Sequence, residues 1–243
     1  TDSIGNTITA LSNGNYVVQS PGWQDNTGAS TWGDGTKGIV GLVTTGNSVV
    51  GGTTNSNVGE YAVALSNGNY GVVSPGWNTN GGAVTWVNGA SSTSSIVSAQ
   101  NSLVGSSDGD EIGSQGVYAL TNGNYAVSSP YWNGGAGAVT WGNGTTGVSG
   151  AVAENNSLVG SLSTDNIGLH GIYVLSNGNY VVSSSSWNHL QGAITWSSGT
   201  LGATGVVSTS NSFVGSASDR EIGNIFVLSN GNYVMESQWA GNN

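Results

Sequence analysis

Five tryptophans recur at one place in a repeated pattern, each directly after a short β-rich run. They are Trp23, Trp77, Trp132, Trp187 and Trp239. Polar residues follow them, among them Asn78, Asn133 and Asn188. An indole ring offers an apolar face to the CH groups of a sugar, while amides bind sugar hydroxyls. The set therefore predicts repeated sites for neutral glycans, although a repeated tryptophan is equally suited to packing between units.

A second tryptophan series ends a repeated Gly-Ala-x-Thr-Trp strand. Its members are Trp32, Trp86, Trp141 and Trp196. A large ring inside a strand buries much apolar area, so we expect this series to pack between units. The asparagines on either side of each repeated glycine, such as Asn122 and Asn124, are expected to serve only the turn that contains them.

No set of catalytic groups is visible in the sequence. Glycosidases need two or more converging carboxylates, but runs expected to be innermost, such as Val117–Leu120, contain no acid. His170 and His189 have no partner at metal-ligand spacing. The acidic linker at 108–111 is expected to be a solvated loop, with a cation site as the alternative. We therefore expect no enzymatic activity, no cofactor and no metal.

The charge balance excludes whole classes of partner. The chain has 2 Lys+Arg against 12 Asp+Glu and a net charge of -10, whereas nucleic acids and anionic membranes both require clusters of cations. No stretch is long and apolar enough to enter a membrane. The neutral polar surface suits sugars. A secreted or cell-surface protein is expected, and the absence of cysteine leaves the redox compartment open.

The string Leu-Ser/Thr-Asn-Gly-Asn-Tyr occurs five times, at intervals of 53 to 55 residues. It begins at Leu11, Leu65, Leu120, Leu175 and Leu228. Such a period indicates stacked or radially arranged units, none of which buries its apolar face alone. The Asn-Gly pair between two β-rich runs predicts a hairpin with a type I′ turn, in which both central residues have positive φ.

The third unit displays the expected strands. Gly116–Leu120 and Tyr125–Ser129 flank the turn, Gly137–Trp141 is a third strand, and Asn156–Gly160 is a fourth. Glycine is dense and the pattern has period two, so no helix is expected. Four short antiparallel strands in a repeat of this length predict an all-β fold, namely a β-propeller of four-stranded blades. A β-solenoid is the rival.

The order Ile-Gly, Asn-Gly-Asn-Tyr, Val-Ser-Ser-Pro, Gly-Ala-Val-Thr-Trp resembles the FG-GAP blade of integrin-α-type propellers, and the likeness covers every repeat. The resemblance implies a propeller. That family's loop carries aspartates as calcium ligands, whereas the loop here has none, so we expect no calcium there. The strings Gly-Ala-Val-Thr-Trp-Gly-Asn-Gly and Asn-Ser-Leu-Val-Gly-Ser are similar to repeats of filamentous-haemagglutinin-like bacterial surface proteins, which implies adhesion.

The repeats predict one domain at 1–243. Its units are expected at 2–55, 56–109, 110–164 and 165–219, with a half-repeat at 220–243. Five first hairpins against four copies of the later strands favour a five-bladed ring with an incomplete last blade. A four-bladed ring with an extra hairpin, or closure by a second chain in a homo-oligomer, is the alternative.

Two functions fit these observations. The first is a non-catalytic, multivalent, lectin-like module that binds glycans or cell-surface glycoconjugates, because equivalent weak sites reinforce one another on a clustered surface. The alternative is a structural or protein-binding repeat of a bacterial surface adhesin. The second function requires the junction tryptophans to be buried, and the first requires them to be accessible.

Overall fold

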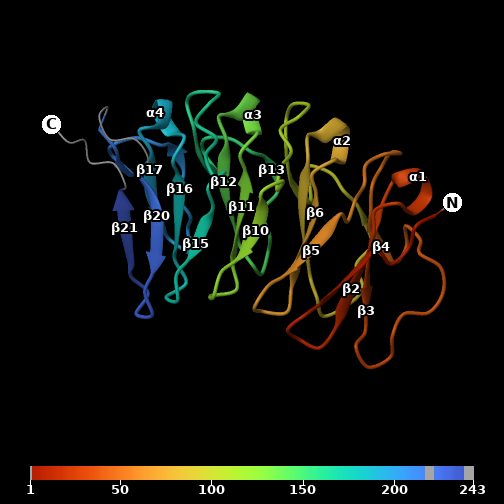
Figure 1. Ribbon diagram of the computed structural model, residues 1–243. Helices are drawn as coiled ribbons and strands as arrows, with labels where there is room; N and C mark the ends of the chain where they lie inside the picture. Colours follow the sequence, from red (N-terminus) through yellow and green to blue (C-terminus); the bar gives the residue numbers. More distant parts are fainter. Residues whose placement is uncertain (1, 217–221, 238–243) are drawn as a thin grey trace.

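In the computed structural model, which describes residues 2–216 and 222–237, each Leu-Ser/Thr-Asn-Gly-Asn string turns a β-hairpin (Figure 1). The predicted type I′ turn is wrong, because the glycine alone is left-handed: φ is 88° at Gly14, and Asn13 has no positive φ. Leu11 N–H donates to Asn15 O at 2.8 Å, and Gly14 N–H donates to Leu11 O at 3.1 Å. This wider turn ends in a left-handed glycine.

Two strands of each unit form the hairpin, with tyrosine at the start of the second strand. The first strands are β1 (Thr7–Ala10), β5 (Tyr61–Ala64), β10 (Gly116–Ala119), β15 (Ile172–Val174) and β20 (Ile222–Val227). The second strands are β2 (Tyr16–Ser20), β6 (Tyr70–Ser74), β11 (Tyr125–Ser129), β16 (Tyr180–Ser184) and β21 (Tyr233–Ser237).

A one-turn segment separates the hairpin from the later strands. These segments are α1 (Trp23–Asn26), α2 (Trp77–Asn80), α3 (Trp132–Gly135) and α4 (Trp187–Leu190). The third strands are β3 (Ala29–Gly33), β7 (Ala83–Val87), β12 (Ala138–Gly142) and β17 (Ala193–Ser197). The fourth strands are β4 (Ser48–Val50), β9 (Ser102–Val104), β14 (Ser157–Val159) and β19 (Phe213–Val214).

The four-stranded antiparallel unit that the sequence predicts is present, as in the order β1-β2-β3-β4. One further strand joins most sheets from the next unit. These two-residue strands are β8 (Ser95–Ile96), β13 (Gly150–Ala151) and β18 (Gly205–Val206). Each pairs in parallel with the fourth strand of the preceding unit, as in Val49↔Ser95. Successive units are therefore joined through their sheets.

The apolar core lies between neighbouring sheets. One cluster combines Leu65, Val84 and Leu103 of the second unit with Val117 and Val127 of the third, and similar clusters join the other neighbouring units. A unit thus buries its apolar faces only against its neighbours, which is the arrangement of a repeat protein.

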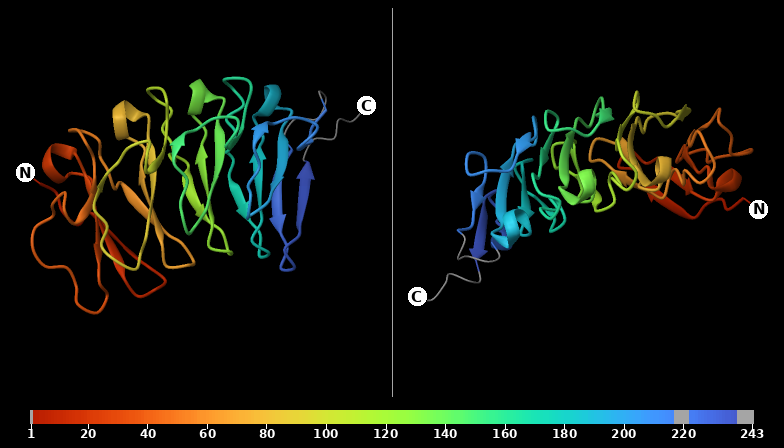
Figure 2. Two further views of the ribbon diagram at one scale, coloured as in Figure 1. Left: turned by 180° about the vertical axis from the view of Figure 1, so that it is seen from behind. Right: turned by 90° about the horizontal axis from the view of Figure 1, so that it is seen from above.

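The described units form an open row. Figures 1 and 2 show the sheets side by side in chain order, with the N- and C-terminal units at opposite ends, and the view from above shows a shallow arc. The all-β repeat fold is confirmed. The expected closed ring, five-bladed or four-bladed, is not observed, because the described units follow one another in a row whose two ends do not meet (Figure 2). Four full units run from β1 to β4, β5 to β9, β10 to β14 and β15 to β19. Of the expected fourth repeat, 217–219 lie outside the described residues, as do 220–221 and 238–243 of the expected half-repeat.

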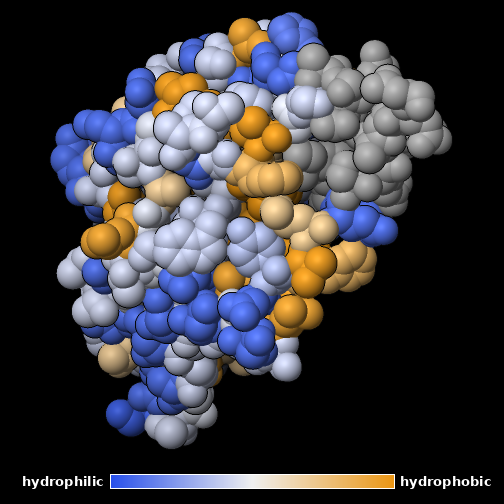
Figure 3. All heavy atoms as spheres, turned by 90° about the vertical axis from the view of Figure 1, so that its left-hand side faces the viewer, coloured by the Kyte–Doolittle hydropathy of each residue, from blue (hydrophilic) through white to orange (hydrophobic). Residues whose placement is uncertain are grey.

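The C-terminal end of the row exposes apolar side chains of a kind that interior units cover. Trp196 is 49% exposed and Phe213 is 59% exposed. Figure 3, which faces this end, shows apolar surface gathered on it. Beyond the fourth unit the described residues form only the hairpin β20-β21, which leaves these two side chains exposed.

Candidate functional site

The junction tryptophans do not all present the ring faces that sugar stacking requires. Trp23 and Trp187 are buried, with exposed fractions of 8% and 9%. Trp77 and Trp132 are half-buried and pack against the cores between units, and Trp239 lies outside the described residues. The expected stacking platform is wrong for Trp23 and Trp187, because neighbouring side chains cover their rings.

The predicted asparagines each follow a tryptophan into a left-handed turn. The angle φ is 50° at Asn78, 51° at Asn133 and 47° at Asn188. Asn78 and Asn133 are exposed, whereas Asn188 is half-buried and donates from Nδ2 to Gln191 Oε1 at 2.8 Å. The turns α1 to α4 form a ridge along one edge of the row (Figure 1). The sequence analysis expected no helix and did not predict these left-handed one-turn segments.

These left-handed turns require specific support. In α1 the residues Gln24, Asp25 and Asn26 have φ of 48°, 52° and 60°, and a left-handed backbone costs a non-glycine residue roughly 1–2 kcal/mol. Gly28 N–H donates to Trp23 O at 3.0 Å and closes the turn. In three of the four units, an aspartate that precedes the unit's strands gives the turn a second source of support.

Buried linker aspartates hold two of these turns. Asp110 accepts Asn133 N–H at 2.9 Å through Oδ1, and it accepts Ser106 N–H and Ser107 N–H through Oδ2. Asp165 holds Asn188 N–H at 2.9 Å in the same way. The expectation of a solvated acidic loop is wrong for Asp110, because its carboxylate is buried and accepts backbone N–H groups. Among the described residues no group of acids or histidines is arranged to hold a metal.

The repeated asparagines and the second tryptophan series form the joint between units. Gly144 O accepts from Asn67 Nδ2 at 2.7 Å, Asn69 Nδ2 at 2.8 Å and Trp86 Nε1 at 2.9 Å. Gly89 O and Gly199 O each accept from the two equivalent asparagines and the equivalent tryptophan of the preceding unit. The expectation that the asparagines serve only their own turn is therefore wrong. No sequence signal indicated it, because donor and acceptor are about 57 to 77 residues apart.

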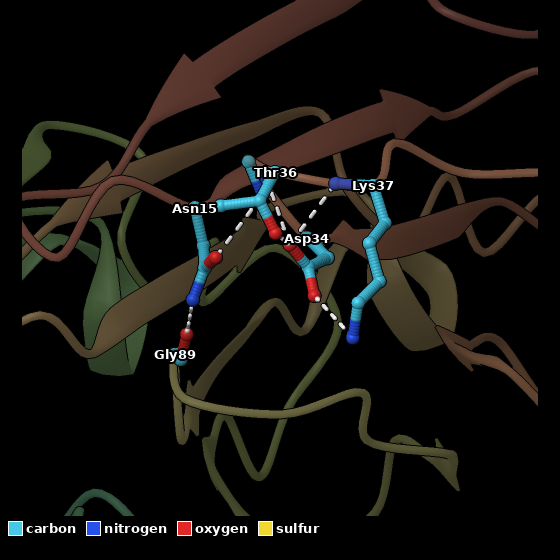
Figure 4. Close-up of polar contacts among 6 residues, drawn as sticks. Asn15, Asp34, Thr36, Lys37 and Gly89 are labelled. Atoms are coloured by element: carbon cyan, nitrogen blue, oxygen red, sulfur yellow. Dashed lines mark hydrogen bonds and ion pairs between the residues drawn. The ribbon is translucent and has the colours of Figure 1, made fainter.

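Figure 4 shows the first joint, where Asn15 donates from Nδ2 to Gly89 O at 3.0 Å. Beside it, Asp34 accepts from Thr36 and forms an ion pair with Lys37, with 3.6 Å between Nζ and Oδ2. The Thr36 hydroxyl and N–H hold the pKa of Asp34 below its usual range. This ion pair joins two residues of a single turn, with the Lys37 side chain exposed and the Asp34 side chain half-buried.

The buried tyrosines are structural. Tyr70, Tyr125 and Tyr180 begin second strands and lie in the cores between units. Burial raises the pKa of Tyr180 to about 12 and raises the pKa of Tyr70 and Tyr125 further above the ordinary value. Phenols of this kind remain neutral at physiological pH, so none of the three supplies a tyrosinate base.

Two hollows lie on the ridge. One has a volume of about 520 Å³, and its lining includes Glu111, Tyr131, Ser163 and Asn166. The other, also about 520 Å³, lies at the first unit, where the exposed edge of Trp23 contributes to the lining together with Gln24, Asp25 and Ile96 among others.

Comparison with known proteins identifies one family. No curated protein matches the chain. The family model of a repeat of unknown function, DUF5650, matches four successive segments, which are 10–60, 64–114, 119–169 and 174–224. These segments cover most of the chain and correspond to the four full units of the structure, so the chain belongs to the DUF5650 repeat family.

Proposed function

We propose that this chain is a non-catalytic repeat scaffold of a secreted or cell-surface protein, which holds other parts of that protein or its partners apart. This is the structural repeat of a surface adhesin that the sequence offered as its alternative function. The observation that carries the proposal is the joint, in which three donors of one unit meet a single carbonyl of the next unit, as at Gly144.

The residues that recur at the same place in each repeat are thus used to pack one unit against the next. Asn67, Asn69 and Trp86 contact the following unit, and the hairpin tyrosines fill the core between units. Stability in such a row is approximately a sum of unit and joint contributions, and its length grows with each unit. A scaffold needs this property, whereas a catalyst needs convergent side chains.

The surface supports the same proposal. With two cations in the sequence, strong attraction to nucleic acid is not expected. No helix in the described chain has the length and hydropathy that crossing a bilayer requires.

Multivalent glycan binding is the second candidate. Asn78 and Asn133 are exposed beside the half-buried Trp77 and Trp132, which favours it in the second and third units. Burial of Trp23 and Trp187 weighs against equivalent sites in every unit. A glycan array tests this candidate, because multivalent sites at these tryptophans give reproducible hits that disappear in the double variant Trp77→Ala/Trp132→Ala.

Distances between spin labels test the scaffold directly. The chain has no cysteine, so single cysteines can be introduced at equivalent exposed turn positions: Ser12, Thr121, Ser176 and Ser229. Packed sheets are about 10 Å apart, so labels two, three and four units from Ser12 are expected at about 20, 30 and 40 Å. If the distance from Ser12 to Ser229 is shorter than the distance from Ser12 to Ser176, the units form a ring. A ring does not hold its ends apart, so this result would refute the proposal.

A further inference from the structure

An exposed aromatic side chain of the ridge, Tyr131, lies at the third unit. It borders a hollow whose lining residues take no part in the joints between units. Tyr131 precedes α3 and is 45% exposed, although Pro130 before it is buried. The hollow of about 520 Å³ lies between α3 and the linkers on either side of it, with Tyr131 on its lining. Its volume is within the range of small-ligand sites.

The fold does not require an aromatic at this position. The residues that precede the equivalent turns are Gly22, Gly76 and Ser186. Tyr131 is therefore a feature of one unit. A phenol ring beside a hollow offers an apolar face with a polar tip, which suits a ligand that has both kinds of surface.

Glu111 supplies a carboxylate to the same hollow. Its backbone is left-handed, with φ of 46°, and it is fixed by donation of its N–H to Asn80 O at 2.9 Å. Asn57 and Asn166 occupy the equivalent positions, with φ of 47° and 45°. Asparagine tolerates this backbone better than glutamate does, so the strain at Glu111 points to a use for its side chain.

Other polar groups complete the lining. Asn166 donates from Nδ2 to Pro130 O at 3.3 Å, which fixes the amide. Within the described residues, Asn166 Oδ1, the Ser163 hydroxyl and the Glu111 carboxylate have no hydrogen-bond partner. Gly109 and Gly134 border the hollow without side chains, and a Cβ at either would meet open space. The backbone of these two glycines is therefore accessible from the hollow.

From this arrangement we propose that the third unit binds a neutral sugar residue in this hollow. A CH face of the pyranose ring packs on Tyr131, and sugar hydroxyls donate to Glu111 and Asn166 Oδ1. Anionic sugars are disfavoured by Glu111 and by the net charge of -10. The site is independent of the proposed scaffold function, because neither the Tyr131 nor the Glu111 side chain takes part in a joint.

Ligand-observed and protein-observed NMR on the full chain test the proposal. The probes are free glucose, galactose, mannose and N-acetylglucosamine, with sialic acid as the anionic comparison and choline as the cationic one. The expected result is a saturable shift of the Gly134 and Asn166 amides with a neutral sugar. In the variant Tyr131→Ala the affinity is expected to fall about tenfold or more, since loss of about 1.4 kcal/mol corresponds to a factor of ten.

Matched variants separate a site from a general surface effect. Tyr131→Phe is expected to retain most of the affinity, because the ring face remains, and Glu111→Gln is expected to reduce it. Leu190→Ala truncates an exposed side chain on the neighbouring turn α4 and should leave sugar binding unchanged. Circular dichroism and a thermal melt check that each variant is folded.

Three results would overturn the proposal. They are no saturable shift with any neutral sugar, tighter binding of choline or sialic acid than of every neutral sugar, and equal affinity of wild type and Tyr131→Ala. None of these results bears on the spin-label distances, so the site and the scaffold are tested separately.

Discussion

Asn69→Ala is the substitution that best isolates one joint. Asn69 accepts Gly89 N–H at 3.1 Å within its own unit, and it donates from Nδ2 to Gly144 O at 2.8 Å in the next unit. Asn179 is equivalent in the fourth unit. It accepts Gly199 N–H at 3.0 Å, but no acceptor for its Nδ2 lies among the described residues. The two side chains differ in the bond between units and in little else.

The expected magnitude follows from this difference. Both variants lose the bond inside the unit and leave a glycine N–H without its acceptor. Only Asn69→Ala also loses a bond between units, and a hydrogen bond contributes about 1 kcal/mol net. Gly144 O keeps Asn67 and Trp86 as donors, so no unsatisfied carbonyl adds to the loss. We expect Asn69→Ala to reduce the free energy of unfolding by about 1 kcal/mol more than Asn179→Ala does.

Urea unfolding followed by circular dichroism measures both variants under the same conditions. A terminal unit can open before the rest of a repeat protein, and this alone would reduce the apparent effect at Asn179. Asn15→Ala controls for it. Asn15 lies in the first unit of the row yet donates to Gly89 O at 3.0 Å, so its variant should resemble Asn69→Ala. If Asn15→Ala and Asn69→Ala are no more destabilising than Asn179→Ala, the joint does not stabilise the row and the reasoning fails.

Three further predictions concern the second tryptophan series, the buried linker aspartate and a buried tyrosine. Trp86→Phe removes the Nε1 donor to Gly144 O and should lower the urea midpoint by the equivalent of about 1 kcal/mol, whereas Trp196→Phe should stay within about 0.5 kcal/mol of wild type. Asp110→Ala leaves three backbone N–H groups without their acceptor and should cost about 2–4 kcal/mol, whereas Asp108→Ala, at an exposed carboxylate, should cost little; thermal melts compare them. The pKa of Tyr180 is raised from 10.0 to about 12, so the stability that its neutral phenol contributes is complete below pH 10 and is lost as the pH rises from 10 to 12; an alkaline titration should show tyrosinate absorbance and unfolding together over that range.

The local structure could be predicted from the sequence, and the connections between units could not. The Asn-Gly pair and the β-rich runs on either side of it predict the hairpin, and Gly137–Trp141 predicts the third strand (β12, Ala138–Gly142). A two-residue strand such as Gly150–Ala151 carries no periodic pattern. The sequence therefore did not predict that each such strand joins the sheet of the preceding unit. Trp187 is buried in a cluster that includes Leu158 of the preceding unit, which only the packed row brings near it. Trp23 is buried with Ala29 and Val50 of its own unit, a contact that no periodic pattern indicates.

The ring and the row differ by a quantity that no sequence pattern encodes, which is the rotation between one unit and the next. Both arrangements use the same hairpins, the same period and the same apolar faces. In the row, the rotation is limited at two separated points. Asn69 and its neighbours bond to Gly144 near the hairpin turns, and Leu103 pairs with Gly150 at the opposite side of the sheet. Two such attachments on either side of a packed core fix both the spacing and the tilt of the next unit. Weakening one of them, as Asn69→Ala does, should therefore change the distances between spin labels as well as the stability, and it should do so only across the altered joint.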